Sequence, residues 1–396
     1  MSTSNSLLTV SRFLGVAALG KRGPIRWIHC VWCLSLVCYV WIASIYKCLS
    51  FKSAMPTIEK ILYLMEFPGN MAVTGFLAYY ALRNRPCAQD TELQIHRFVG
   101  GLESKVAKLI YRRHCQRSLQ LVWVVIAFHV LCALVDIGTF NFDWCATAFS
   151  NSIYNLPALM MSLGILQYVQ PVHILGLLLE NLRMRLEELK LHQRPPISAT
   201  KLDADYEAAF GVLVDAGGCS GLLLEELRTM CYTIDQLHKK LMDKFGIFLL
   251  LNFANSLTSF CVELYLVFNF FETPLWEESL LLIYRLLWLC MHGGRIWLIL
   301  AVNTWILEQK CHLFQLINEL EVCSSHLERI INRFLFQLQT SLSQPPEACG
   351  IIPLDTLEVG GFIGVLMAIV IFLIQIGLGN KSLMGVALNR SNWVYV

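Results

Sequence analysis

Charged side chains are scarce in this sequence. Asp, Glu, Lys and Arg make up 15% of its 396 residues and hydrophobic residues make up 56%, whereas soluble domains are roughly 25% charged. This composition excludes an ordinary water-soluble domain and indicates an integral membrane protein. The formal net charge is only +2 and no block of basic residues is present, so we expect no nucleic-acid partner.

The motifs of common catalytic sites are also missing. The sequence has no Walker loop, no HExxH and no GxSxG. The glycine-rich stretch 217–221 (GGCSG) lacks the phosphate-binding pattern, and we expect a loop or a helix break there. One CxxC, from Cys30 to Cys33, has no second pair at zinc spacing. We therefore expect no catalytic residues, no metal site and no cofactor.

Seven long apolar runs are present instead, each close to the ~20 residues that cross ~30 Å of hydrocarbon. They do not alternate apolar and polar residues as the strands of a membrane barrel do, so helices are expected. The runs are 27–46, 61–82, 119–137, 152–179, 245–268, 280–302 and 360–378. The sequence predicts an all-α membrane protein with seven transmembrane helices.

Lys and Arg are distributed unevenly over the connections between these runs. The N-terminal segment and the second, fourth and sixth connections hold 24 of them, the opposite side holds five, and two lie within the sixth run. Because cytoplasmic loops retain Lys and Arg, we expect a cytoplasmic N-terminus and an extracellular C-terminus, opposite to a G-protein-coupled receptor. The sequon at Asn389 then lies outside and is the expected glycosylation site. Cys48 and Cys145 fall at the predicted outer ends of helices, so they form either a disulfide with each other or two free thiols.

The predicted cytoplasmic side contains helices of its own. After the sixth run, apolar residues recur at three- and four-residue intervals with charged residues between them, which predicts one long amphipathic helix. Helices lying on the membrane surface and a packed bundle that joins subunits both fit, and the mixed charge of the polar face favours the bundle. The expected segments are a cytoplasmic 1–26, a transmembrane 27–302, a cytoplasmic anchor helix 303–359, a last helix 360–378 and an extracellular tail 379–396.

A few polar residues interrupt the apolar runs. Gln375 in the last run is an amide that hydrocarbon cannot satisfy, and either a water-filled path or a hydrogen bond to a neighbouring helix explains it. Glu263 and Arg285 lie at similar depths on helices of opposite direction, so we expect them to meet. They serve either as a structural pair or with one end open to a polar ligand. Arg295 lies deeper and is expected to reach toward the cytoplasmic interface.

The last helix resembles that of the insect gustatory receptor family, which carries Thr-Tyr, five hydrophobic residues and then Gln-Phe. Aligned on Gln375, this sequence reads Ala368-Ile369, five hydrophobic residues and Gln375-Ile376. The spacing and the Gln match, whereas the other three signature residues differ. The stretch 349–355 (CGIIPLD) is similar to the family's lead-in to this helix, which reads Gly, hydrophobic, Phe, hydrophobic, then Asp or Asn.

This resemblance implies a ligand-gated nonselective cation channel subunit, working in homo- or heterotetramers with the seventh helices around the pore. It implies a small-molecule tastant, bitter or otherwise nonvolatile, with cations, membrane lipid and sister subunits as partners. The implied location is the plasma membrane of chemosensory neurons. An odorant receptor of related architecture, a metabotropic seven-helix receptor and a transporter are the alternatives.

The resemblance also implies roles for particular residues. Gln375 would form a ring of amides in the pore, with Ile371, Phe372 and Ile376 as the apolar gate beside it. The ligand pocket would lie among the outer halves of the helices in 27–302. Its aromatic candidates equally suit an interfacial belt. The pocket candidates are Tyr63, Asp136, Tyr154, Glu263, Tyr284, Arg285 and Trp288.

Overall fold

The computed structural model describes residues 2–16, 24–49, 57–83, 87–139, 142–193, 217–272, 279–320, 325–344, 346–355, 360–361, 364–365, 368–372 and 375. Within these residues the chain is helical apart from one short hairpin. The elements are α1 (Ser2–Phe13), α2 (Pro24–Leu49), α3 (Thr57–Arg83), α4 (Cys87–Gly100), α5 (Ser104–Thr139), α6 (Trp144–Ile153), α7 (Asn155–Gln193), α9 (Gly217–Glu272), α10 (Ser279–Asn318), α11 (Ser325–Leu342), β1 (Glu347–Ala348) and β2 (Ile352–Pro353).

Five stretches in the described part of the chain are long and apolar enough to cross a membrane. They are Trp27–Leu49, Ser104–Thr139, Trp144–Lys190, Gly221–Phe268 and Ser279–Asn318. The second expected run corresponds to α3, which has 27 residues, and the last run contains helical segments between 360 and 375. The elements therefore follow the predicted all-α order of seven membrane helices. We call the end where α5 finishes and α10 begins the outer end.

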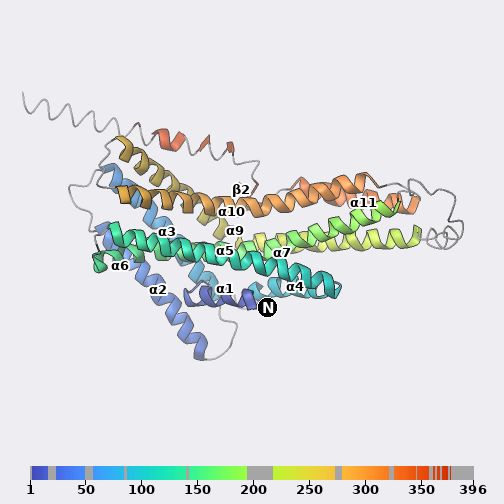
Figure 1. Ribbon diagram of the computed structural model, residues 1–396, viewed down its shortest axis with the longest axis horizontal. Coiled ribbons are helices and arrows are strands. Elements are labelled where there is room, and N and C mark those ends of the chain that lie inside the picture. Colours follow the sequence, from blue (N-terminus) through green and yellow to red (C-terminus); the bar gives the residue numbers. More distant parts are fainter. Residues whose placement is uncertain are drawn as a thin grey trace, which may run out of the picture.

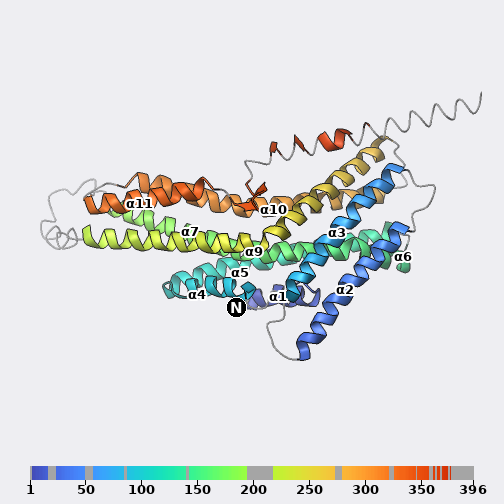
Figure 2. The ribbon, with the colours of Figure 1, turned by 180° about the vertical axis from the view of Figure 1, so that it is seen from behind.

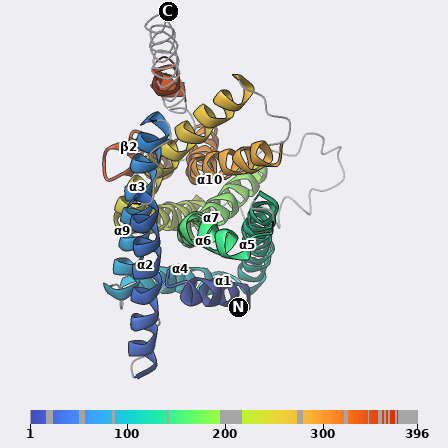
Figure 3. The same cartoon turned by 90° about the vertical axis from the view of Figure 1, so that its left-hand side faces the viewer.

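α7 lies at the centre of the membrane domain. It packs against α3, α5, α6, α9 and α10, and Figure 3 shows the other helices arranged around it. Of the most apolar 18-residue stretch within Trp144–Lys190, 94% is buried. A helix that is apolar on every side suits a buried position, and this one carries Leu and Ile residues around its whole circumference.

Beyond the membrane domain, α7, α9, α10 and α11 continue as one elongated bundle (Figures 1 and 2). α11 packs against α9 and α10 through buried apolar residues at three- and four-residue spacing, namely Leu327, Ile330, Ile331, Phe334 and Leu338. The prediction of one long amphipathic helix is wrong, because α10 ends at Asn318. There the amide of Glu319 bonds the carbonyls of both Gln315 and Leu316 at 3.2 Å, which is the tightened last turn of a helix end.

The glycine-rich stretch 217–221 also differs from expectation. It opens α9, a continuous helix of 56 residues, rather than forming a loop or a break. A Cβ at Gly221 would lie in ordinary contact with His326 and Ile330 of α11. A small residue here lets α9 and α11 approach each other closely.

The stretch that resembles the family's lead-in to the last helix forms a β-hairpin. β1 and β2 pair antiparallel, and the turn between them places Cys349 and Gly350 at φ of 56° and 68°, a left-handed conformation that glycine adopts without strain. The hairpin packs on α9. Just after it, Asp355 accepts a hydrogen bond of 3.2 Å from the hydroxyl of Thr304 in α10. The hairpin therefore ties the start of the last helix to two helices of the bundle.

Candidate functional site

The segments of the last helix lie on the outside of the bundle, drawn in red in Figures 1 and 3. Ile371 and Phe372 are 48% and 61% exposed, and Gln375 is exposed too. Val370 is buried, and Ile376 lies outside the described residues. In a membrane protein, large apolar side chains left uncovered by the chain itself face lipid or another subunit.

The expected pair of intramembrane charges is present at the outer half of α9 and α10. Arg285 donates hydrogen bonds of 3.1 and 3.3 Å to the two carboxylate oxygens of Glu263. Glu66 of α3 is buried and interacts electrostatically with both residues. This site, which we call the outer charge cluster (Glu66, Glu263 and Arg285), thus holds two carboxyl groups against one guanidinium.

Asp136 is buried in a hydrogen-bonded network with α6. Its two carboxylate oxygens accept bonds from the hydroxyl of Ser150 at 3.1 Å and from the amide of Asn151 at 2.8 Å. Asp143 caps the start of α6 by accepting from the backbone amides of Cys145 and Ala146, which holds the helix carrying these partners in place. Asp136 is therefore satisfied within the chain.

Three aromatic candidates form one cluster at the outer end. The ring of Trp288 lies 6.3 Å from that of Tyr154 and 5.9 Å from that of Tyr284, both edge-on. Tyr284 also interacts electrostatically with Asp136 and Arg285. The structure thus brings six of the seven predicted pocket residues into one region. Tyr63 lies on α3, but its side chain is outside the described part of the structure.

Arg295 does not reach the cytoplasmic interface as predicted. It is buried, with its Nε donating to the hydroxyl of Ser162 at 3.1 Å and its Nη2 donating to the carbonyl of Ala158. Ala158 also packs in the same apolar cluster as Trp288, and Ser162 lies one helical turn further along α7. A side chain on a helix leans toward the helix N-terminus, which for α10 is the outer end, and that direction turns Arg295 back into the bundle.

A polar chain connects Arg295 to Asp136. Ser162 lies 3.3 Å from Nε2 of His129, and Nδ1 of His129 lies 2.6 Å from the side-chain oxygen of Asn155. Because an amide oxygen only accepts, His129 carries its proton on Nδ1. The Asn155 amide then donates to Asn151 at 2.9 Å, and Asn151 donates to Asp136.

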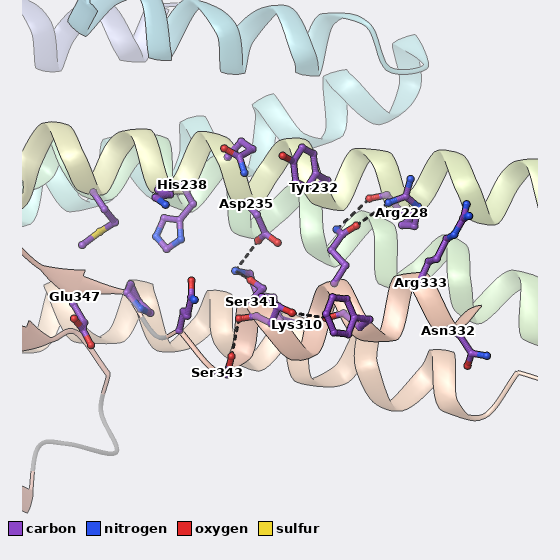
Figure 4. Close-up of a pocket in the computed structure, with 18 of the residues that line it drawn as sticks. Arg228, Tyr232, Asp235, His238, Lys310, Asn332, Arg333, Ser341, Ser343 and Glu347 are labelled. Carbon is purple, nitrogen blue, oxygen red and sulfur yellow. Dashed lines mark hydrogen bonds and ion pairs between the residues drawn. The ribbon is translucent and has the colours of Figure 1, made fainter. Parts of the chain in front are cut away.

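The elongated bundle contains a groove of about 1310 Å³ between α9, α11 and the hairpin (Figure 4). Within it, Lys310 lies 2.7 Å from a carboxylate oxygen of Asp235 and donates a 2.8 Å hydrogen bond to Ser341. The groove also carries exposed aromatic rings and charges of both signs. These include Tyr232, Lys239, Glu328, Arg329, Arg333, Phe336 and Glu347.

Other predictions concern cysteines, metals and glycosylation. Cys48 and Cys145 are both free thiols. In the part of the chain that is described, no group of three or more His, Cys, Asp or Glu residues is placed to hold a metal ion. Asn389 lies outside the described residues.

The sequence-based reasoning overlooked three ionisable residues of these sites. Glu66 interrupts the second apolar run, His129 the third and His292 the sixth. The rule that an ionisable residue within a membrane helix marks a functional site applied to all three. Counting ionisable residues in every run would have identified them.

Comparisons with known proteins agree with this architecture. The family model described as 7tm chemosensory receptor matches residues 5–380. A Drosophila melanogaster protein named "Putative gustatory receptor 59e" is 64% identical over 392 residues, covering 99% of this chain and 98% of that protein.

Two solved structures share the fold. The insect olfactory receptor OR5 from Machilis hrabei in complex with eugenol has a TM-score of 0.68 at 12% identity, covering 94% of this chain and 96% of that one. A second structure of the same receptor has a TM-score of 0.50 at 14% identity and the same coverage. The family match over nearly the whole chain and the close relative together identify this multi-pass membrane protein as a member of the 7tm chemosensory receptor family.

Proposed function

We propose that the chain is a gustatory receptor acting as a subunit of a ligand-gated, nonselective cation channel, with four subunits around one pore. The observation that carries this proposal is the exposure of Gln375 together with Ile371 and Phe372 on the last helix. Four such helices around an axis would bring the amides together as a hydrated ring. The large apolar side chains one turn away would form a constriction that closes by dewetting.

The groove of the elongated bundle is the surface by which sister subunits meet in this proposal. Phe336 and Tyr232 are 73% and 52% exposed there, beside charges of both signs. Aromatic residues and Arg are enriched at protein interfaces, whereas a helix lying on a membrane presents a mainly basic polar face. These features support contact with another subunit in a homo- or heterotetramer.

The ligand in this proposal is a small organic tastant, bitter or otherwise nonvolatile, bound among the outer halves of α3, α5, α7, α9 and α10. The aromatic cluster and the outer charge cluster supply apolar walls with a few polar groups, as ligand sites do. The related olfactory receptor was solved with eugenol, which supports a small organic ligand. The receptor would reside in the plasma membrane of chemosensory neurons.

Whole-cell recording tests the channel. The chain would be expressed alone and with candidate sister subunits in cells that lack other receptors, and exposed to a panel of nonvolatile and volatile compounds. We expect ligand-evoked cation current that persists when G proteins are blocked with GDPβS. Responses to volatile compounds alone would favour an odorant receptor, and substrate flux without unitary currents would favour a transporter.

Gln375→Ala tests the pore assignment. We expect altered unitary conductance or cation selectivity at unchanged surface expression, because the substitution removes the amide ring. Gln315→Ala is the matched control, since Gln315 is an exposed glutamine on the cytoplasmic extension of α10. Conductance and selectivity that are identical in both variants and the parent would contradict a pore-lining Gln375.

Terminal tags test the topology and separate the channel from a metabotropic receptor. A tag before Met1 should stain only after permeabilisation, and a tag after Val396 should stain on intact cells. Glycosidase should shift the parent protein and not the Asn389→Gln variant. An N-terminal tag that stains on intact cells would favour the metabotropic arrangement.

A further inference from the structure

Arg295 is a buried cation without an anionic partner in the described part of the chain. It is 4% exposed, and its hydrogen bonds go to the Ser162 hydroxyl and the Ala158 carbonyl. Its third nitrogen, Nη1, is buried with no hydrogen-bond partner. Buried charges in proteins are normally paired. This guanidinium therefore lacks both a counter-charge and an acceptor for Nη1.

His292 adds a second unpartnered group on the same face of α10. It is 2% exposed, and neither of its ring nitrogens has a hydrogen-bond partner. It interacts electrostatically with Arg295, and its ring lies 5.9 Å from that of Trp288. Residues 288, 292 and 295 are spaced by four and three, so they share one face of the helix.

The free hydrogen-bonding capacity of this face consists mainly of donors. The Nη1 of a guanidinium carries two N–H groups, and a neutral imidazole offers one donor and one acceptor. Water can satisfy donors, but it does not neutralise the charge. An anion with acceptor oxygens both accepts these hydrogen bonds and neutralises the charge. Carboxylates pair with guanidinium groups through two parallel hydrogen bonds.

The nearest carboxylate along the hydrogen-bonded network is too remote to serve. Between Arg295 and Asp136 stand four side chains, those of Ser162, His129, Asn155 and Asn151. This chain uses Nε of Arg295 and fixes the orientation of the guanidinium, while Nη1 remains outside it. Such a rigidly held donor is what a preorganised binding group requires.

The surroundings determine what kind of anion fits. Trp288 belongs to an apolar cluster with Ala158 and Met291, against which Phe128, Tyr154 and Tyr284 pack. These aromatic and aliphatic side chains suit contact with a carbon skeleton rather than with an inorganic ion. The outer charge cluster holds two carboxyl groups against one cation, so an anion is not favoured at Arg285.

We propose that the receptor binds a small organic acid whose carboxylate lies against Arg295 and His292 and whose apolar or aromatic body packs on Tyr154, Tyr284 and Trp288. This inference rests on the proposed chemosensory function and specifies the chemical class of the ligand.

Matched pairs of compounds test the charge requirement. The probes are hexanoate, phenylacetate and hydrocinnamate, each compared with its primary amide, which has nearly the same shape without the charge. Two readouts are used on cells or purified full-length protein expressed with its sister subunits: evoked current and the ligand-induced shift in Tm. We expect at least one acid to act at concentrations tenfold or more below those of its amide.

Variants test the residues. Arg295→Met should abolish the response to the acid, and Arg295→Lys should retain part of it because the cation remains. Because Arg295 also bonds α7, His292→Phe provides a second variant that breaks no hydrogen bond of the described structure and keeps a ring of similar size; a rise of about threefold or more in the half-maximal concentration is expected. Surface expression and tetramer elution monitor folding.

The outcomes separate this inference from the proposed channel. If no acid shifts Tm or evokes current, or if acid and amide act equally, the inference is wrong even where another tastant opens the channel. If His292→Phe and Arg295→Lys both leave the acid response unchanged, the assigned residues are wrong. An acid-dependent Tm shift without any current would retain the ligand class and contradict the channel.

Discussion

Arg285 and Glu263 are joined by two hydrogen bonds inside the membrane domain, linking α10 to α9 at 3.1 and 3.3 Å. The side chains are 19% and 6% exposed, so water screens their attraction only weakly. The two helices run in opposite directions, and the pair fixes their positions relative to each other along the helix axes. Each partner is therefore needed mainly because the other is present.

Replacing Arg285 alone should cost more than replacing both residues of the pair. Arg285→Met leaves the buried carboxyl groups of Glu263 and Glu66 without a cation, and we expect a loss of about 3–5 kcal/mol. Glu263→Gln should cost less, because Arg285 still lies near Glu66, and the double variant should recover part of the loss seen in Arg285→Met. Thermal unfolding of the purified protein provides the measurement. A double variant less stable than both single variants would contradict mutual neutralisation.

Gly176 should be intolerant of any side chain. A Cβ at this position in α7 would overlap the ring of Trp305 in α10, which also stacks on His173 at 5.2 Å. We expect Gly176→Ala to destabilise the protein by about 1–3 kcal/mol, and Trp305→Leu in the same chain to recover part of it. Surface expression and Tm report the effect.

Gly294→Ala is the control for this effect, since a Cβ there meets nothing within 4 Å. Alanine is favoured over glycine within a helix by about 0.5–1 kcal/mol, so this variant should be neutral or slightly stabilised. Equal losses at both glycines would contradict the steric explanation at Gly176.

Lys310→Met should weaken the elongated bundle. Its ammonium is nearly buried between Asp235 at 2.7 Å and Ser341 at 2.8 Å, so the substitution strands the Asp235 carboxylate at a cost of about 3 kcal/mol. We expect a lower Tm and less of the proposed tetramer in size-exclusion chromatography. Lys239→Met changes an exposed lysine of the same groove and should leave the Tm unchanged.

In the proposed channel, Asp355→Ala should alter gating rather than folding. The Asp355 carboxylate accepts from Thr304 at 3.2 Å directly after the hairpin that precedes the last helix. Losing the bond from Thr304 by itself changes an equilibrium by about 1 kcal/mol, or roughly fivefold. We expect a shift of that size in the half-maximal ligand concentration at normal surface expression. Asp355→Asn, which keeps an acceptor, should shift it less.

The sequence contained enough information for the helices and for one intramembrane contact. Apolar runs and charge counts identify membrane helices because hydrocarbon penalises charged side chains and unpaired backbone groups. Equal depth on antiparallel helices was sufficient to bring Glu263 and Arg285 together. Both inferences depend only on helix geometry and solvent.

Other features depend on tertiary packing and were not predicted. The direction taken by Arg295 depends on its lean toward the helix N-terminus and on the acceptors that α7 offers. The start of α11 could have been predicted from the sequence, because Ser325 to Glu328 has the Ser-x-x-Glu pattern of a helix start. In the proposed channel the partners of the exposed last helix belong to other subunits, and a single sequence contains no direct record of them.

The enclosure of α7 has a consequence for synthesis. The helix is synthesised before α9 and α10, which later cover much of its surface, so it first enters lipid before the Tyr168 hydroxyl can bond to Met242 of α9 and Asn303 of α10. Polar side chains in hydrocarbon are costly until a partner arrives. During synthesis, therefore, the helix that is most deeply buried in the folded receptor is for a time exposed to lipid without its partners. Slowed translation or a shortage of chaperones would affect this step first.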